Sequence, residues 1–85
     1  MATSQISKDI SRAIRKRLHA AGVPHFQAAE WAGISPAKLS LRLSGGAEWR
    51  LTELNNFSEQ VFGMPLVSLL EIATSPLKGM SENYG

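Results

Sequence analysis

The stretch Lys38–Ser44, KLSLRLS, constrains the fold most, because alternating apolar and polar residues are typical of a half-buried β-strand. Its flanks favour a helix instead. Ser35 and Pro36 are a typical helix start, and Gly45-Gly46 is a typical stop. The chain offers no second strand-like run for pairing. We therefore predict a helix here.

The two sides of this helix differ in character. At about 100° per residue, Leu39 and Leu43 share one side, which is predicted to face the core. The opposite side combines small, apolar and polar residues with two flanking cations: Ala37, Leu41 and Ser44, with Lys38 and Arg42. Such a composition is unusual for a side that is merely solvated.

Four further helices are predicted from apolar spacing and from stop signals, at about residues 4–21, 24–32, 52–62 and 65–73. Pro24 suits the first turn of the second, and Thr52 is a plausible N-cap of the fourth. Trp49 is predicted to join the core. The sequence thus predicts an all-α domain, a compact bundle of about five short helices over residues 1–74, followed by a flexible tail at 75–85.

Composition narrows the class of protein. The 85 residues suffice for one domain, and the 44% of apolar residues favour a folded chain. The absence of cysteine excludes a disulfide or a cysteine-based zinc site. His19 and His25 have no nucleophile or paired carboxylate at a suitable spacing, so no catalytic residue, metal, cofactor or small-molecule substrate is predicted. With no membrane span and no signal-peptide core, a cytoplasmic protein, near the nucleoid of a bacterial host, is the expectation.

Charge is distributed unevenly along the chain, although its net value is only +2. Residues 1–22 carry five lysines and arginines against one aspartate, whereas residues 51–85 carry four glutamates against one lysine. This asymmetry is compatible with a polyanion bound on one side, or with ordinary solvated helix faces.

The segment at about 24–45 has the pattern of a helix-turn-helix unit. Ala29 and Gly33 are small where two helices must cross closely, Ile34 is apolar in the turn, and Leu39 follows five residues later. In such a unit the second helix is free to enter the major groove of DNA.

Residues 10 to about 70 resemble the helix-turn-helix domain of phage repressors and Cro proteins, the XRE family. The matching segments are IRKRLHAAGV, AAEWAGIS, LSLRLSGG, TELNNF and GMPLVSLL. The resemblance implies a lambda-repressor-like fold and a regulator that occupies a double-stranded DNA operator. The chain departs from the family pattern at His25, where Gln is usual, in the apolar outer side of the third helix, and in a Leu54–Gly63 spacing about one residue longer.

The resemblance also implies which residues contact DNA. The base contacts would be Pro36, Ala37, Lys38 and Leu41. Ala37 and Leu41 suit thymine methyl groups, and Lys38 suits guanine or a phosphate. The backbone contacts would be His25, Gln27, Ser35, Arg42 and Arg50, with the amides of Gly45 and Gly46. The alternatives are a plain surface leucine at position 41, a solvated lysine at position 38, and an Arg50 that packs along Trp49.

Partners and alternative functions remain open at this point. A homodimer is expected, because one small module reads few base pairs, and Leu66, Leu69 and Leu70 are a possible interface. The same leucines would serve equally to close a small core. An antitoxin or an excision-control protein uses the same module. A helical protein-interaction module that binds through Phe26 and Trp31, without DNA, is the alternative of another class.

Overall fold

The computed structural model describes residues 3–74, so the prediction of a flexible tail at 75–85 lies outside the described residues. Four α-helices are followed by a π-helical turn and a last helical segment. Their bounds are α1 Gln5–Ala21, α2 His25–Ala32, α3 Pro36–Leu43, α4 Leu51–Asn56, η1 Phe57–Val61 and the segment 66–74. The predicted all-α fold is confirmed, and KLSLRLS is helical over Lys38–Leu43.

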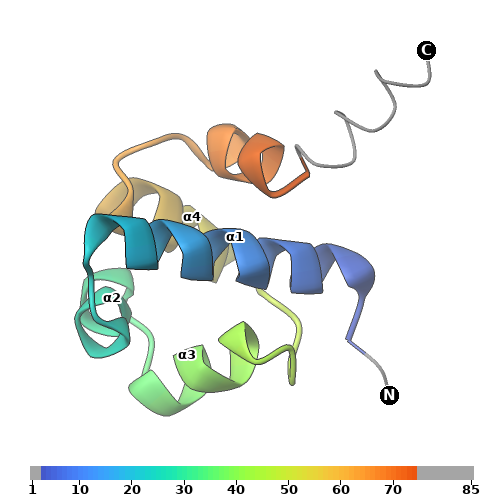
Figure 1. Cartoon of the computed structure of the whole chain (residues 1–85), viewed down its shortest axis with the longest axis horizontal. Helices are drawn as coiled ribbons and strands as arrows, with labels where there is room; N and C mark the ends of the chain where they lie inside the picture. Colours follow the sequence, from blue (N-terminus) through green and yellow to red (C-terminus); the bar gives the residue numbers. More distant parts are fainter. Residues whose placement is uncertain (1–2, 75–85) are drawn as a thin grey trace.

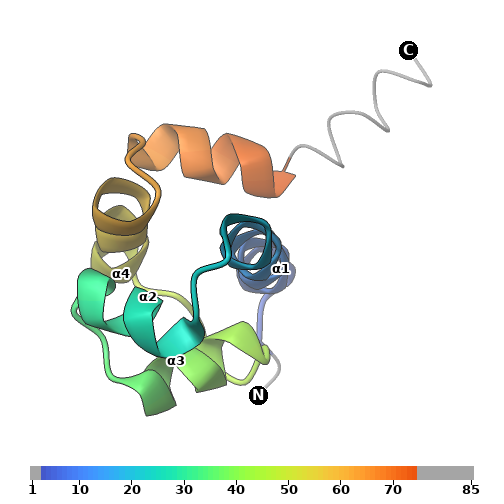
Figure 2. The same cartoon turned by 60° about the vertical axis from the view of Figure 1, so that its left-hand side comes forward.

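Helix α1, with 17 residues, is the longest of the described helices. Figure 2 views it nearly end-on, with the last segment above it, α4 to one side, and α2 and α3 below. Its start is fixed by Ser4, whose Oγ accepts the Ser7 N–H at 3.3 Å. The predicted stripe of Ile10, Ile14 and Leu18 is confirmed, since each is buried. In Figure 1, α1 runs across the molecule; α3 packs against it, whereas α2 packs mainly against α3 and η1.

Aromatic and aliphatic side chains from all the elements fill a single core. Trp49 packs edge-on against the fully buried Phe57, with ring centroids 5.6 Å apart. Leu39 and Leu43 enter the same core from α3. The prediction that Trp49 belongs to the core is therefore confirmed.

The fourth helix differs from its prediction at both ends. It begins at Leu51 with Arg50 as N-cap, so Thr52 as N-cap is wrong. The physical reason is Glu53, whose carboxylate accepts the Arg50 N–H at 3.0 Å and thereby satisfies the helix start.

At the other end the backbone widens into the η1 turn, where the Phe62 N–H donates to the Phe57 carbonyl. A π-turn holds one more residue than an α-turn, which accounts for the longer spacing before Gly63.

The last segment closes the core and presents few leucines to solvent. Leu69 is fully buried, so its place in a dimer interface is wrong, because its side chain is already enclosed by the chain's own core. Leu66 and Leu70 are partly buried and pack against that core as well. Of this segment's large apolar side chains, Val67 is the one that is mostly exposed. The alternative that these leucines complete a small core is the one the structure supports.

Candidate nucleic-acid interface

The turn between α2 and α3 sets the angle of the third helix. Gly33 has a φ of 70°, a conformation that glycine adopts without strain. Its N–H donates to Glu30, and the Ile34 N–H donates to Ala29, which closes the end of α2. Ser35 then starts α3 at once, its Oγ accepting the Lys38 N–H at 3.2 Å. Two eight-residue helices joined by so short a turn form a helix-turn-helix unit.

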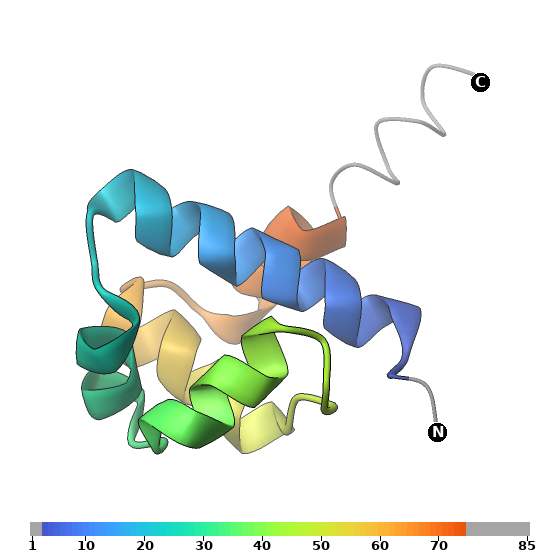
Figure 3. The same ribbon diagram turned by 60° about the horizontal axis from the view of Figure 1, so that its bottom comes forward.

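The outward side of α3 is available to a ligand. Pro36, Ala37, Lys38 and Leu41 are all exposed, as the sequence predicted for this side. Leu41 is 49% exposed, and the other part of its side chain lies against Gly46. Figure 3 shows α3 at the surface, between α1 and the start of α4. The four side chains predicted for base contacts are thus all accessible to a ligand.

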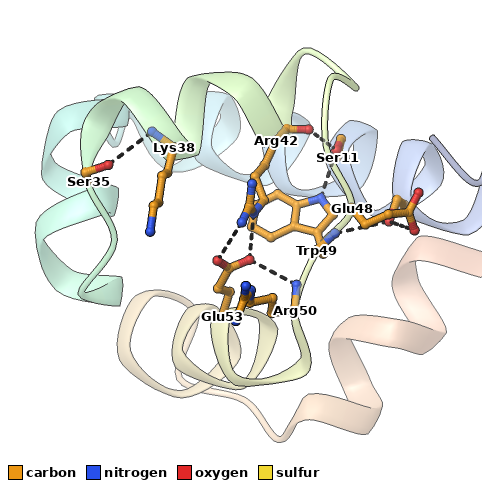
Figure 4. A network of polar contacts seen from close by, with 9 residues as sticks. Ser11, Ser35, Lys38, Arg42, Glu48, Trp49, Arg50 and Glu53 are labelled. Atoms are coloured by element: carbon orange, nitrogen blue, oxygen red, sulfur yellow. Dashed lines mark hydrogen bonds and ion pairs between the residues drawn. The ribbon is translucent and has the colours of Figure 1, made fainter. Parts of the chain in front are cut away.

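Arg42 does not belong to that surface, although the sequence placed it at its edge. Its Nε donates to Glu53 Oε1 at 2.7 Å and its Nη2 donates to Oε2 at 3.1 Å. The two side chains are only 11% and 14% exposed. Figure 4 shows Lys38 and Arg42 extending from the same side of α3, with Arg42 reaching Glu53. The prediction of a solvent-facing cation at this position is wrong, because the guanidinium is held inside by a two-pronged ion pair.

This ion pair joins the third helix to the fourth. Burial raises the pKa of Glu53, but the hydrogen bonds from Arg42 and from the Arg50 N–H lower it more, so that the pKa lies below its ordinary value. Arg50 itself is exposed at the start of α4. Its side chain therefore remains a candidate for backbone contact, whereas that of Arg42 is committed to Glu53.

The backbone N–H groups of the glycines after α3 are also hydrogen-bonded within the chain. The Gly45 N–H donates to the Arg42 carbonyl at 3.1 Å, and the Gly46 N–H donates to the Leu41 carbonyl at 2.9 Å. These two bonds, with a φ of 83° at Gly45, form a standard helix-terminating motif. The prediction that both amides are open to a phosphate is wrong, because the end of α3 already uses them.

The remaining predicted backbone contacts lie at the starts of the two helices. His25 is the exposed first residue of α2, and Gln27, its third residue, is half-buried. Ser35 is exposed, and its oxygen accepts a hydrogen bond while its hydroxyl hydrogen is not engaged by a described residue. These three residues, together with Arg50, keep polar groups at the surface beside α3.

A row of serines on α1, which sequence reasoning missed, holds the loop that follows α3. Ser11 Oγ accepts the Trp49 indole N–H at 2.9 Å and donates to the Arg42 carbonyl at 2.6 Å. Ser7 Oγ accepts the Trp49 backbone N–H at 3.2 Å. Figure 4 shows this network around Trp49. The spacing of serines at positions 4, 7 and 11, on one side of a helix, was the available signal.

Glu48 completes the attachment of the loop to the start of α1. Its carboxylate accepts the N–H and the hydroxyl of Ser4 and, at 3.0 Å, the hydroxyl of Ser7. The Ser4 N–H and hydroxyl, opposed by a small desolvation and aided by Ser7, lower the pKa of Glu48 below its ordinary value. The loop after α3 is therefore held to α1 by the hydrogen bonds of the Glu48 carboxylate and by the buried Trp49 indole.

Within residues 3–74, no cluster of three metal-ligating side chains occurs. Among the helices of that same part, none has the length and apolar content needed to span a bilayer.

The all-helical architecture and the α2–turn–α3 geometry define a helix-turn-helix domain. Neither a scan against protein-family models nor a search of curated proteins gives a match. A search of solved structures finds a similar fold in the crystal structure of the clp gene regulator ClgR from Corynebacterium glutamicum. That chain superposes with a TM-score of 0.76 at 21% sequence identity, over 96% of this chain and 88% of the other. At such identity the likeness concerns the fold.

Proposed function

We propose that this protein is a sequence-specific double-stranded DNA-binding transcriptional regulator without catalytic activity, of the phage-repressor or Cro type. It acts by occupying an operator with α3. The observation that carries the proposal is the outward side of α3, where Ala37, Lys38 and Leu41 are exposed within a helix-turn-helix unit. The fold shared with a protein described as a gene regulator supports the same class.

Specificity in this proposal comes from three side chains. Ala37 and Leu41 contact thymine methyl groups, which distinguish thymine from the other bases in the major groove. Lys38 reaches guanine O6 and N7 or an adjacent phosphate. Pro36 packs at the base edges at the start of α3. His25, Gln27, Ser35 and Arg50 set the register of the protein on the duplex by contacting the sugar-phosphate backbone.

Selection from random duplexes tests the function, because it yields the sequence, length and symmetry of any operator. Lys38→Ala and Leu41→Ala are each expected to weaken binding to the selected operator by about 1–3 kcal/mol, and to weaken binding to random duplex far less. Thr52→Ala is the matched control, an exposed position on α4 that the proposal does not use. Failure to select any sequence, or operator binding by both α3 variants at the strength of the control, would refute the proposal.

The regulator is proposed to bind as a homodimer in the cytoplasm of a bacterial host, on two half-sites about one helical turn apart. Sedimentation with and without the selected operator tests this. A one-to-one complex on an asymmetric site, well above the dissociation constant, would show that it acts as a monomer. An antitoxin or an excision-control protein would bind DNA through the same module.

A second candidate function rests on two exposed aromatic side chains of α2. Phe26 is 65% exposed and Trp31 is 47% exposed, and aromatic residues are enriched in protein interfaces. A protein-interaction module without a DNA role would use them. Retention on random duplex DNA at low salt, with release by added salt, distinguishes the two functions, since such a module would pass through unretained.

A further inference from the structure

Three cations form a row along α1 beside the end of α3. Lys8, Arg12 and Arg15 recur at intervals of four and three residues, which places them on one side of the helix. With Ser11 and residues 43–45 they line an open surface pocket of about 430 Å³. All three are exposed, and no acidic residue of the described part lines this pocket. These three cations lie on α1, outside the helix-turn-helix unit.

The row lies beside the end of α3, and one of its cations is bonded to it. Arg15 Nη1 donates to the Leu43 carbonyl at 2.8 Å, which leaves the other N–H groups of a five-donor guanidinium. The Lys8 side chain runs beside Gly45. Arg12 pairs at 3.3 Å with Asp9, which lies one turn earlier on α1, so its charge is partly neutralised. Two of the three cations, Lys8 and Arg15, therefore lie beside the end of α3 without an acidic partner in residues 3–74.

We propose that Lys8 and Arg15, assisted by Arg12, bind the phosphodiester backbone at the edge of the groove that α3 enters. This inference rests on the proposed function and extends the interface beyond the helix-turn-helix unit. An eight-residue helix is about 12 Å long at about 1.5 Å per residue, close to the width of the major groove, about 12 Å. When the start of α3 is at the bases, its end lies near a backbone strand, and the pocket beside that end meets phosphates.

The two sides of α3 then carry separate sets of cations. Figure 4 shows Lys38 and Arg50 on the side of α3 that faces α4, whereas Lys8 and Arg15 belong to α1 and line the pocket at the end of α3. A duplex whose groove holds α3 has a phosphate strand on each side. The lysine and arginines of the row on α1 would contact the phosphate strand that the predicted contacts do not reach.

Helix α1 offers a matched control within the same helix. Lys16 and Arg17 line a different pocket, against the last helical segment, and the Arg17 guanidinium lies 5.7 Å above the Phe62 ring. The double variants Lys8→Gln/Arg15→Gln and Lys16→Gln/Arg17→Gln each remove two positive charges from α1. A difference in DNA affinity between the two double variants is therefore due to where the charges lie, because both variants lose the same net charge.

The experiment measures the affinity for duplex DNA, random and selected, as a function of salt concentration. Each phosphate contact contributes about 0.9 to the slope of log K against log salt, so Lys8→Gln/Arg15→Gln is expected to flatten the slope by about 1–2 on both duplexes. The Lys16→Gln/Arg17→Gln slope is expected to stay near that of the unmodified protein. Since Arg15→Gln removes a bond to α3, Lys8→Gln alone is measured as well, with an expected change of about one contact.

Two outcomes would overturn the proposal. Equal slopes for the two double variants would show that the charges on α1 act only through the net charge, and an unchanged slope for Lys8→Gln and its double variant would show no contact. If Lys38→Ala and Leu41→Ala still impair operator binding, the function stands and the α1 surface alone is refuted. If the unmodified protein binds no duplex, both proposals fail together.

Discussion

Removal of the Glu53 side chain tests how α3 is held in place. Glu53→Ala deletes the acceptor of three hydrogen bonds, two from Arg42 and one from the Arg50 N–H. The Arg42 side chain, 11% exposed, then keeps its charge without its carboxylate partner. A buried charge without a partner lowers the free energy of unfolding, because the ion pair no longer compensates for removing the charge from water.

The expected loss of unfolding free energy is about 3 kcal/mol, the low end of the range for breaking a buried ion pair, because both side chains keep slight exposure. A domain of this size has a total stability of about 4–11 kcal/mol. The variant should therefore still fold at low temperature, with a clearly reduced urea midpoint. Tryptophan fluorescence follows the transition, since Trp49 leaves the core on unfolding.

The double variant Arg42→Leu/Glu53→Leu serves as the comparison. It removes both charges and replaces them with apolar atoms of similar reach, so its stability is expected within about 1 kcal/mol of the unmodified protein, or above it. A loss below about 0.5 kcal/mol for Glu53→Ala would match an exposed surface pair. In that case Arg42 would be free in solution, and its exclusion from the DNA-facing surface would be refuted.

Two further predictions concern the core and the response to acid. Leu39→Ala is expected to cost about 2–5 kcal/mol in urea unfolding, the range for a fully buried leucine, and an unchanged midpoint would contradict the packing of α3. The pKa values of Glu48 and Glu53 lie below the ordinary 4.5, so the stabilisation they supply is complete above that pH and is lost as the pH falls through their folded-state values. Thermal unfolding from pH 7 to pH 3 should show this decline, with a smaller decline for Glu53→Gln; equal declines would exclude Glu53 as a cause.

Local sequence signals predicted the elements well, because helix ends are determined by a few adjacent residues. Ser35 and Pro36 start α3 as predicted, and the glycine after each of the first three helices ends it or follows within two residues. The inward side of α3 was also predictable, since Leu39 and Leu43 are four residues apart. These features need no knowledge of the rest of the chain.

Side-chain partners distant in the sequence were the part that local patterns could not predict. Arg42 lies near the border between the two sides of α3, and its burial depends on Glu53, eleven residues later. The link from Ser11 to Trp49 spans 38 residues. The π-turn is an intermediate case, since the sequence showed a spacing one residue too long but not that the extra residue widens the helix at Phe57–Val61. The first two features are consequences of tertiary packing.

Different residues of α3 serve folding and the proposed recognition. Leu39 is fully buried, and Arg42 is bound to Glu53, so changes at these two residues alter stability. Lys38 extends from the same side of α3 as Arg42, but its ammonium forms no hydrogen bond or ion pair within residues 3–74, and Ala37 is exposed. Substitutions at Ala37 and Lys38 leave the core contacts unchanged and are expected to cost little stability. Under the proposed function, the DNA sequence that is bound can therefore change while the fold remains intact.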